Sequence, residues 1–253
     1  MFFGLVSVLA NAQSHVSDGV KSYDVAENSF LRMPSTQKLV TLQRLDVGRQ
    51  GTVLIPAQIE KLVVEQLTLA SLARLSIAPR ETAFELLIKR AQFADGSTVS
   101  ARGSDGDVGV PGGRGADLHI EIVSGHIDNL IVDTRGGRGG DGWEGMNGES
   151  GRDAACWGLQ AGMGRNGQDG GNGLPGGDGG NITVVLGEPE WLDVIDFLQI
   201  AGIGGQGGRG GQAGAGGDAA DCWAYSVKAS YRGKAGEPGV AAHNGSQGIL
   251  RVQ

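Results

Sequence analysis

The sequence predicts a mainly β and irregular fold in two parts. An N-terminal β-solenoid or sandwich-like region is followed by a polyglycine II helix bundle with interleaved short strands. Three observations predict this division. Apolar residues alternate in short runs between Lys38 and Val99, glycine recurs at every third position from Gly103 onward, and only five of the 47 glycines in the 253 residues precede Gly103. The domain boundary is therefore placed between residues 102 and 103.

The bulk composition excludes several classes of protein. A net charge of −7 argues against nucleic acid and anionic membrane surfaces as the main partners. No run of about 20 apolar residues is present, so no membrane span is expected. The histidines show no metal-ligand spacing, and no residues form a plausible nucleophile or paired-carboxylate arrangement. We therefore expect no cofactor, no metal and no enzymatic activity.

The N-terminus resembles an export signal. Residues 1–12 form an apolar run that ends in Ala10-Asn-Ala12, a small-x-small cleavage pattern, although a short buried strand is an alternative. Residues 13–37 are polar and without a pattern, and we interpret them as a tail or linker. A secreted, extracellular or cell-surface location follows, in which cysteines can form disulfides.

The β-rich region is predicted over residues 38–102. Its apolar runs are short and recur about every eight to ten residues, which is the spacing of an all-β sandwich, barrel or solenoid. Pro56 and Pro79 fall between runs, where turns belong. A helix over residues 59–75 is the competing interpretation, because residues 58–66 contain no helix breaker.

The bundle is predicted over residues 103–253. A period of three matches the polyproline II conformation, which rises about 3.1 Å per residue, and a glycine stripe lets backbones approach closely. A collagen-like or a flexible linker segment fits less well, because the glycine registers are short, strict and regularly interrupted. The glycine positions are 103–112, 136–151, 164–179, 202–217 and 233–248, each in steps of three, with Ala242 in the one missing place.

The registers form two units of about 67 residues. In each unit one extended segment of about 50 Å leads outward, a loop without regular glycine reverses the chain, and a second segment returns. The loops 152–163 and 218–232 match, because Asp153-Ala-Ala-Cys156-Trp157 resembles Asp218-Ala-Ala-Asp-Cys222-Trp223. Cys156 and Cys222 should meet at the far end and form a disulfide, with two free thiols as the alternative.

The registers between 103 and 248 resemble those of polyglycine II (Gly-x-x repeat) bundle proteins. This group includes phage tail-fibre tip adhesins and snow flea antifreeze protein. The resemblance is one of architecture and repeat, and it carries over no individual contact residue. It implies that the far-end loops contact a receptor, as they do in the phage adhesins.

The far-end loops carry the candidate binding residues. Aromatic and arginine side chains are the usual energetic anchors of an interface. The alternative is that both tryptophans cover the disulfide and cap the bundle. Acidic residues along the bundle, such as Asp141, Asp169 and Asp178, are interpreted as a solvated face. The candidate binding residues are Trp157, Trp223, Tyr225, Tyr231 and Arg152.

These observations favour a secreted or surface-exposed, non-catalytic adhesin. Its expected partner is a cell-surface receptor, a glycan or a matrix component. A structural matrix or filament-forming protein is the alternative, in which Ile249–Val252 pairs with another copy and the protein self-associates. Ice binding is a second alternative, but charged side chains at the non-glycine positions suit ice poorly.

Overall fold

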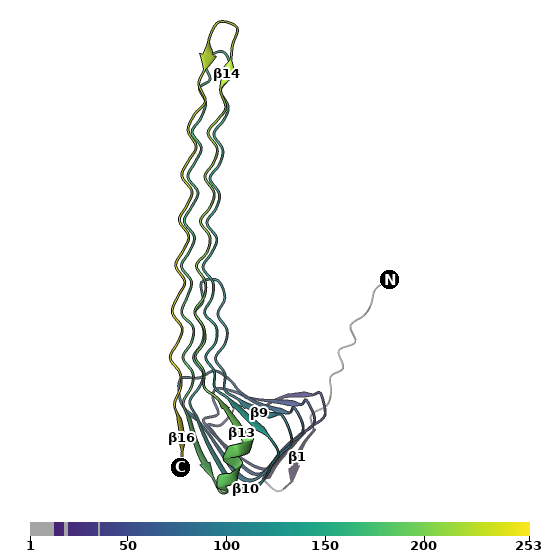
Figure 1. Ribbon diagram of the computed structural model, residues 1–253. Helices are drawn as coiled ribbons and strands as arrows, with labels where there is room; N and C mark the ends of the chain where they lie inside the picture. The colour runs from purple at the N-terminus through teal and green to yellow at the C-terminus, as the bar shows by residue number, and fades with distance from the viewer. Residues whose placement is uncertain (1–12, 18–19, 35) are drawn as a thin grey trace.

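The computed structural model describes residues 13–17, 20–34 and 36–253. The chain alternates between two large sheets, so that most strands pair with the strand two positions earlier and the strand two positions later (Figure 1). All pairs within these sheets are parallel except β1 with β2, which is antiparallel. The predicted signal peptide, residues 1–12, lies outside the described residues.

The first sheet has eight strands and the second has six. The first contains β1 (Gln13–Ser17), β2 (Val20–Val25), β4 (Leu39–Val47), β6 (Lys61–Leu69), β8 (Phe84–Phe93), β10 (Leu118–Ile127), β12 (Ile182–Leu186) and β16 (Leu250–Val252). The second contains β3 (Phe30–Arg32), β5 (Thr52–Ile55), β7 (Arg74–Ile77), β9 (Ser97–Ser100), β11 (Leu130–Asp133) and β13 (Ile195–Leu198). A small hairpin of β14 (Ala220–Asp221) and β15 (Ser226–Val227) stands apart.

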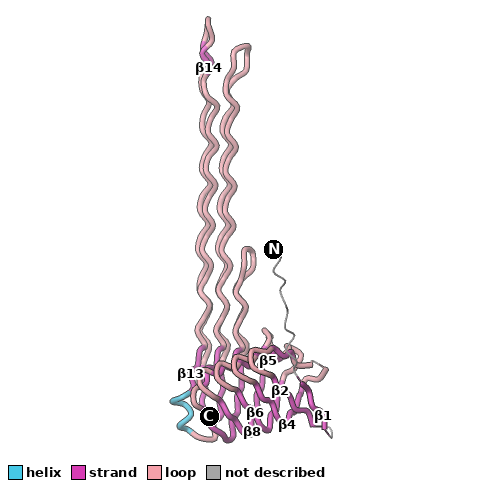
Figure 2. Tube along the Cα trace, turned by 90° about the vertical axis from the view of Figure 1, so that its right-hand side faces the viewer, coloured by secondary structure: helices cyan, strands magenta, loops and turns pink. Residues whose placement is uncertain are grey.

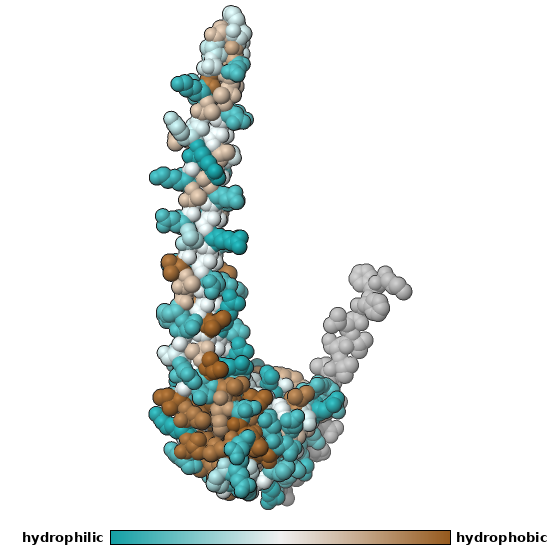
Figure 3. All heavy atoms as spheres, viewed as in Figure 1, coloured by the Kyte–Doolittle hydropathy of each residue, from teal (hydrophilic) through white to brown (hydrophobic). Residues whose placement is uncertain are grey.

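The alternating sequence pattern builds the core between the two sheets. Successive strands place apolar residues in register, so that inward columns such as Val53, Leu75, Val99 and Val132 are almost fully buried. The intervening residues face solvent, as expected for strands with one buried face. Trp191, on the 3-10 helix η1 (Pro189–Val194), packs against the same core. Over β13 and β16 apolar side chains also gather at the surface (Figure 3).

The glycine registers are insertions between strands of these sheets. The first arm (residues 101–117) leaves after β9 and returns to β10. The second arm (residues 134–181) joins β11 to β12, and the third arm (residues 199–249) joins β13 to β16. The three arms leave after β9, β11 and β13, which are neighbouring strands of the second sheet, so they stand side by side. The first arm is much shorter than the others (Figure 2).

The predicted fold class is therefore wrong. The protein is built on two large, mainly parallel sheets that continue on both sides of residue 103, and it is not a polyglycine II helix bundle that follows a separate β region. The physical reason lies in the strands between the glycine registers. Leu118, Leu130 and Ile182 are buried in the same core as Leu86 and Val99, so the strands that carry them belong to the same two sheets.

One local expectation also fails, and one competing interpretation is excluded. Residues 13–37, interpreted as a polar tail or linker, contain β1, β2 and β3 and belong to the sheets. Val25 and Met33, which are buried in the core, anchor this segment despite its polar composition. The helix considered over residues 59–75 is absent, because β6 lies there and β7 begins at Arg74.

Candidate functional site

The second and third arms pair along their whole length and form the stalk (Figure 1). Each arm has an outgoing and a returning segment, and glycine N–H groups link all four. At one level, Gly142 donates to Gln206 O, Gly171 to Trp143 O, Gly208 to Gly171 O and Gly239 to Gly208 O, each at 2.8 Å. The backbone amides of the glycines are thus satisfied between segments, which stiffens the stalk.

Close approach explains why glycine is needed in the stalk. A Cβ atom at Gly208 would lie 1.9 Å from the carbonyl oxygen of Trp143. Past the end of the first arm, the outgoing segment of the second arm carries large side chains at the second position of the triplet. One of these is Trp143, whose ring lies over Gly171. The glycine positions therefore mark the faces of each segment that contact a neighbouring backbone.

A second ladder runs along the stalk through Asp and Asn side chains at the third position of the repeat. The Oδ1 atoms of Asp141, Asn147, Asp169, Asn172 and Asp178 each accept a backbone N–H of the third arm at 2.6–2.9 Å. The interpretation of these acids as a solvated face is therefore incomplete, because each one joins two arms. The sequence signal was the repeated Gly-x-Asx triplet.

Asp141 shows the electrostatic consequence of this ladder. The backbone N–H of Gln206 stabilises its carboxylate and lowers its pKa; desolvation opposes this shift, and the charge and hydrogen bond of Arg138 lower the pKa further. Arg138 also donates to both carboxylate oxygens of Asp141, at 2.9 and 3.1 Å. Ionised Asp141 is thus part of the contact between the two arms.

The disulfide between Cys156 and Cys222 closes the far end of the stalk. The two Cα atoms are 5.8 Å apart, and the residues are 66 positions apart in sequence. The predicted pairing is confirmed. Because the cysteines lie in the loops 152–163 and 218–232, which we call the tip loops, the bond joins the second arm to the third where the glycine ladder ends.

The first tip loop projects Trp157 into solvent. The Ala155 N–H donates to the Leu159 carbonyl at 3.0 Å, which closes a tight turn around Trp157 and Gly158. Trp157 has a φ of 83°, in the left-handed region that a bulky residue rarely adopts. Its side chain is 94% exposed. The expectation that Trp157 covers the disulfide does not fit this geometry.

The second tip loop presents Trp223 in the same way. The hairpin of β14 and β15 places Trp223 directly after Cys222, and the Cys222 N–H donates to the Tyr225 carbonyl at 2.8 Å. Trp223 is 96% exposed. The Tyr225 hydroxyl accepts the N–H of Trp157 at 2.8 Å, so a side chain of one loop fixes the backbone of the other.

Tyr231 and Arg152 occupy the base of the tip. The Gly164 N–H donates to the Tyr231 carbonyl at 3.0 Å, and the Gly162 N–H donates to the Arg152 carbonyl at 2.8 Å, so both backbones belong to the ladder. Both side chains are exposed. The five predicted binding residues therefore lie in the two tip loops, and the contact that sequence reasoning missed is the hydrogen bond from Trp157 to Tyr225.

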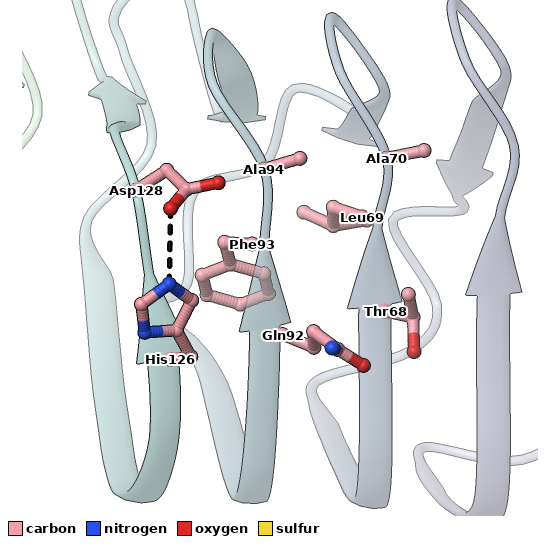
Figure 4. Close-up of a pocket in the computed structure, with 8 residues that line it drawn as sticks. All are labelled: Thr68, Leu69, Ala70, Gln92, Phe93, Ala94, His126 and Asp128. Carbon is pink, nitrogen blue, oxygen red and sulfur yellow. Dashed lines mark hydrogen bonds and ion pairs between the residues drawn. The ribbon is translucent and has the colours of Figure 1, made fainter.

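A shallow depression on the sheets is an alternative site (Figure 4). Its volume is about 310 Å³, and it contains an exposed pair in which His126 Nε2 lies 3.0 Å from Asp128 Oδ1. Thr68, the hydroxyl in its lining, lies on β6, two strands away from His126 on β10. Strand spacing puts that hydroxyl about 10 Å from the imidazole, too far for a nucleophile and base pair.

Within the described ranges, no group of three or more His, Cys, Asp or Glu residues could hold a metal ion. No helix in the part of the chain that the structure describes is long and apolar enough to cross a membrane. No protein-family model, curated protein or solved structure matches the chain. The resemblance to Gly-x-x repeat bundle proteins therefore stays a prediction.

Proposed function

We propose that the protein is a non-catalytic binding protein that acts outside the cell or on its surface and contacts its target through the tip loops. The observation that carries the proposal is the exposure of Trp157 and Trp223, at 94% and 96%, at the disulfide-linked end of the stalk. Large aromatic side chains are strong anchors when a partner buries them. Without a partner, these exposed rings bury almost no surface and therefore add little to the stability of the fold.

The construction of the tip supports the same proposal. The tip loops are held by a disulfide, a hairpin and the Trp157–Tyr225 hydrogen bond, so little conformational entropy remains to be lost on binding. The disulfide is also compatible with an extracellular location, where such bonds persist. A cell-surface receptor, a glycan or a matrix component could be contacted by such a tip.

Alanine substitution at the tip tests the proposal. We expect Trp157→Ala and Trp223→Ala each to weaken binding to intact target cells about 30-fold, the effect of losing about 2 kcal/mol at an aromatic anchor. Trp143→Ala is the matched control, because Trp143 is 60% exposed but lies on the flank of the stalk. Circular dichroism checks folding. Unchanged cell binding by the Trp157/Trp223 double variant would refute the proposal.

A further inference from the structure

The end of the stalk is convex and rich in apolar and aromatic side chains. Besides Trp157 and Trp223, the tip loops expose Tyr231 at 80%, Met163 at 67% and Leu159 at 42%. Leu159 closes the apical turn around Trp157, and Tyr231 and Met163 lie at the base of the tip loops, next to the last ladder bonds. The tip loops are the part of the stalk that lies farthest from the sheets (Figure 1). A convex apolar surface is buried best by a partner that can deform around it.

The charges of the tip loops balance. Three are basic and three are acidic, so the net formal charge is zero, and the loops lack the excess of basic residues that anionic surfaces attract. The basic residues are Arg152, Lys228 and Arg232, and the acidic residues are Asp153, Asp218 and Asp221. The whole chain carries −7, which opposes binding to an anionic surface.

Several backbone groups next to the two rings are already paired. The Ala155 N–H bonds to Leu159 O, the Cys222 N–H to Tyr225 O, and the Trp157 N–H to the Tyr225 hydroxyl. Internal pairing of backbone amides is what a segment needs in order to leave water for the interface of a bilayer. The hydroxyl of Tyr225, a polar handle that a directional ligand would use, is engaged in the same pairing.

The backbone of Trp157 supplies an independent argument. Its φ of 83° is a conformation that costs a bulky residue of order 1–3 kcal/mol and persists only where the surroundings impose it. Here the disulfide at Cys156 and the hydrogen bond to Tyr225 hold that conformation. A fold that strains its backbone to direct an indole into water displays that indole for a partner.

We propose that the tip loops insert shallowly into the interface of an electrically neutral lipid bilayer, with Trp157 and Trp223 as the inserted side chains. Tryptophan and tyrosine concentrate at the level of the lipid headgroups, where an apolar ring with a polar edge is favoured. The stalk then holds the sheets away from the membrane. This inference rests on the proposed function and names the partner of the same tip.

Vesicles of phosphatidylcholine test the inference with the intact, disulfide-bonded protein. We expect co-sedimentation with the vesicles, a blue shift of tryptophan emission, and quenching of that emission by brominated phosphatidylcholine. Trp157→Ala and Trp223→Ala should each weaken vesicle binding at least about tenfold, and the double variant should lose it. Trp143→Ala should bind within about twofold of the wild type and keep the quenching.

Salt separates insertion from electrostatic attraction. Vesicle binding should stay the same between about 50 mM and about 500 mM NaCl, and added anionic lipid should not strengthen it. Vesicle binding that needs anionic lipid, or that survives the double substitution, would overturn the inference.

The outcomes also distinguish this inference from the proposed function. If the wild type does not bind vesicles but binds cells in a tryptophan-dependent way, the lipid inference fails and the tip contacts a protein or glycan receptor. If neither vesicles nor cells are bound through the tryptophans, both proposals fail.

Discussion

The glycine ladder of the stalk predicts a large effect for a single added methyl group. In Gly208→Ala, the new Cβ would lie 1.9 Å from the carbonyl oxygen of Trp143 and 2.5 Å from its carbonyl carbon. Neither atom belongs to a flexible side chain, so the arms must separate. The hydrogen bonds from Gly208 to Gly171 and from Gly239 to Gly208, both 2.8 Å long, would be disrupted.

The size of the effect follows from these contacts. Overpacking costs about 1–3 kcal/mol and two disrupted hydrogen bonds about 2 kcal/mol, while alanine recovers about 0.4–1 kcal/mol by restricting the unfolded chain. We expect a net loss of about 2–4 kcal/mol in the stability of the stalk. Amide hydrogen exchange reports this loss directly, as a fall of about 30- to 1,000-fold in the protection of the stalk amides.

A matched glycine substitution controls for conformational cost. A Cβ at Gly109, in the first arm, would meet nothing within 4 Å, and its φ of 81° is the sole penalty for Gly109→Ala, about 1 kcal/mol. Stalk protection should be unchanged in that variant. If Gly208→Ala left the stalk amides as protected as in the wild type, close backbone packing would not be what holds the arms together.

Four further predictions concern the tip, the side-chain ladder and the sheets. Trp157→Gly should raise thermal stability by about 1 kcal/mol while weakening cell binding, because glycine accepts the positive φ; equal or lower stability would contradict the strain. Cys222→Ser should destabilise the tip loops by about 2–4 kcal/mol in urea unfolding, and no change would show that the ladder alone holds them. Asp169→Ala should cost about 1 kcal/mol and Asp169→Asn almost nothing, since the amide oxygen still accepts the Glu237 N–H; equal losses would refute the ladder. Arg135→Gln should lower stability at pH 7, and this loss should shrink as the pH falls below about 3.9, whereas an equal loss at every pH would exclude the ion pair with Asp133.

The sign of the pH effect follows from the pKa of Asp133. Burial alone would raise this pKa, but hydrogen bonds and charge from Arg135 outweigh burial, and the pKa lies below its usual value. A lowered folded-state pKa gives stability that is present above the unfolded value of about 3.9 and is lost as the pH falls through the folded value. Urea unfolding at pH 7 and at a series of pH values below about 3.9 therefore follows this loss.

Local periodicity allowed much of the stalk and the tip to be predicted. The period of three located the outgoing and returning segments, because each glycine marks a backbone contact that a Cβ would block. The matching loops predicted the disulfide between Cys156 and Cys222. The separations of 65 and 68 residues between ladder partners such as Asp141–Gln206 and Asp169–Glu237 agree with the repeat of about 67 read from the sequence.

The continuity of the sheets could not be predicted from local patterns. Leu118 pairs with Phe84 across the whole first arm, and Ile182 pairs with Leu118 across the second. Strand pairing over such separations leaves no local signal, and the change in glycine content at Gly103 suggested a boundary where the sheets in fact continue. The exposure of Trp157 likewise depends on a φ value that its sequence neighbours do not specify.

The stiffness of the stalk is the claim on which the binding proposals depend most directly. Ala235 and Gln247 both lie at exposed third positions of the returning segment of the third arm, 12 residues apart. Spin labels on Ala235→Cys and Gln247→Cys should give one narrow distance near 37 Å, from about 3.1 Å per residue. A broad distribution near 19 Å, the value for a flexible glycine-rich coil of that length, would contradict a stiff stalk that presents its tip.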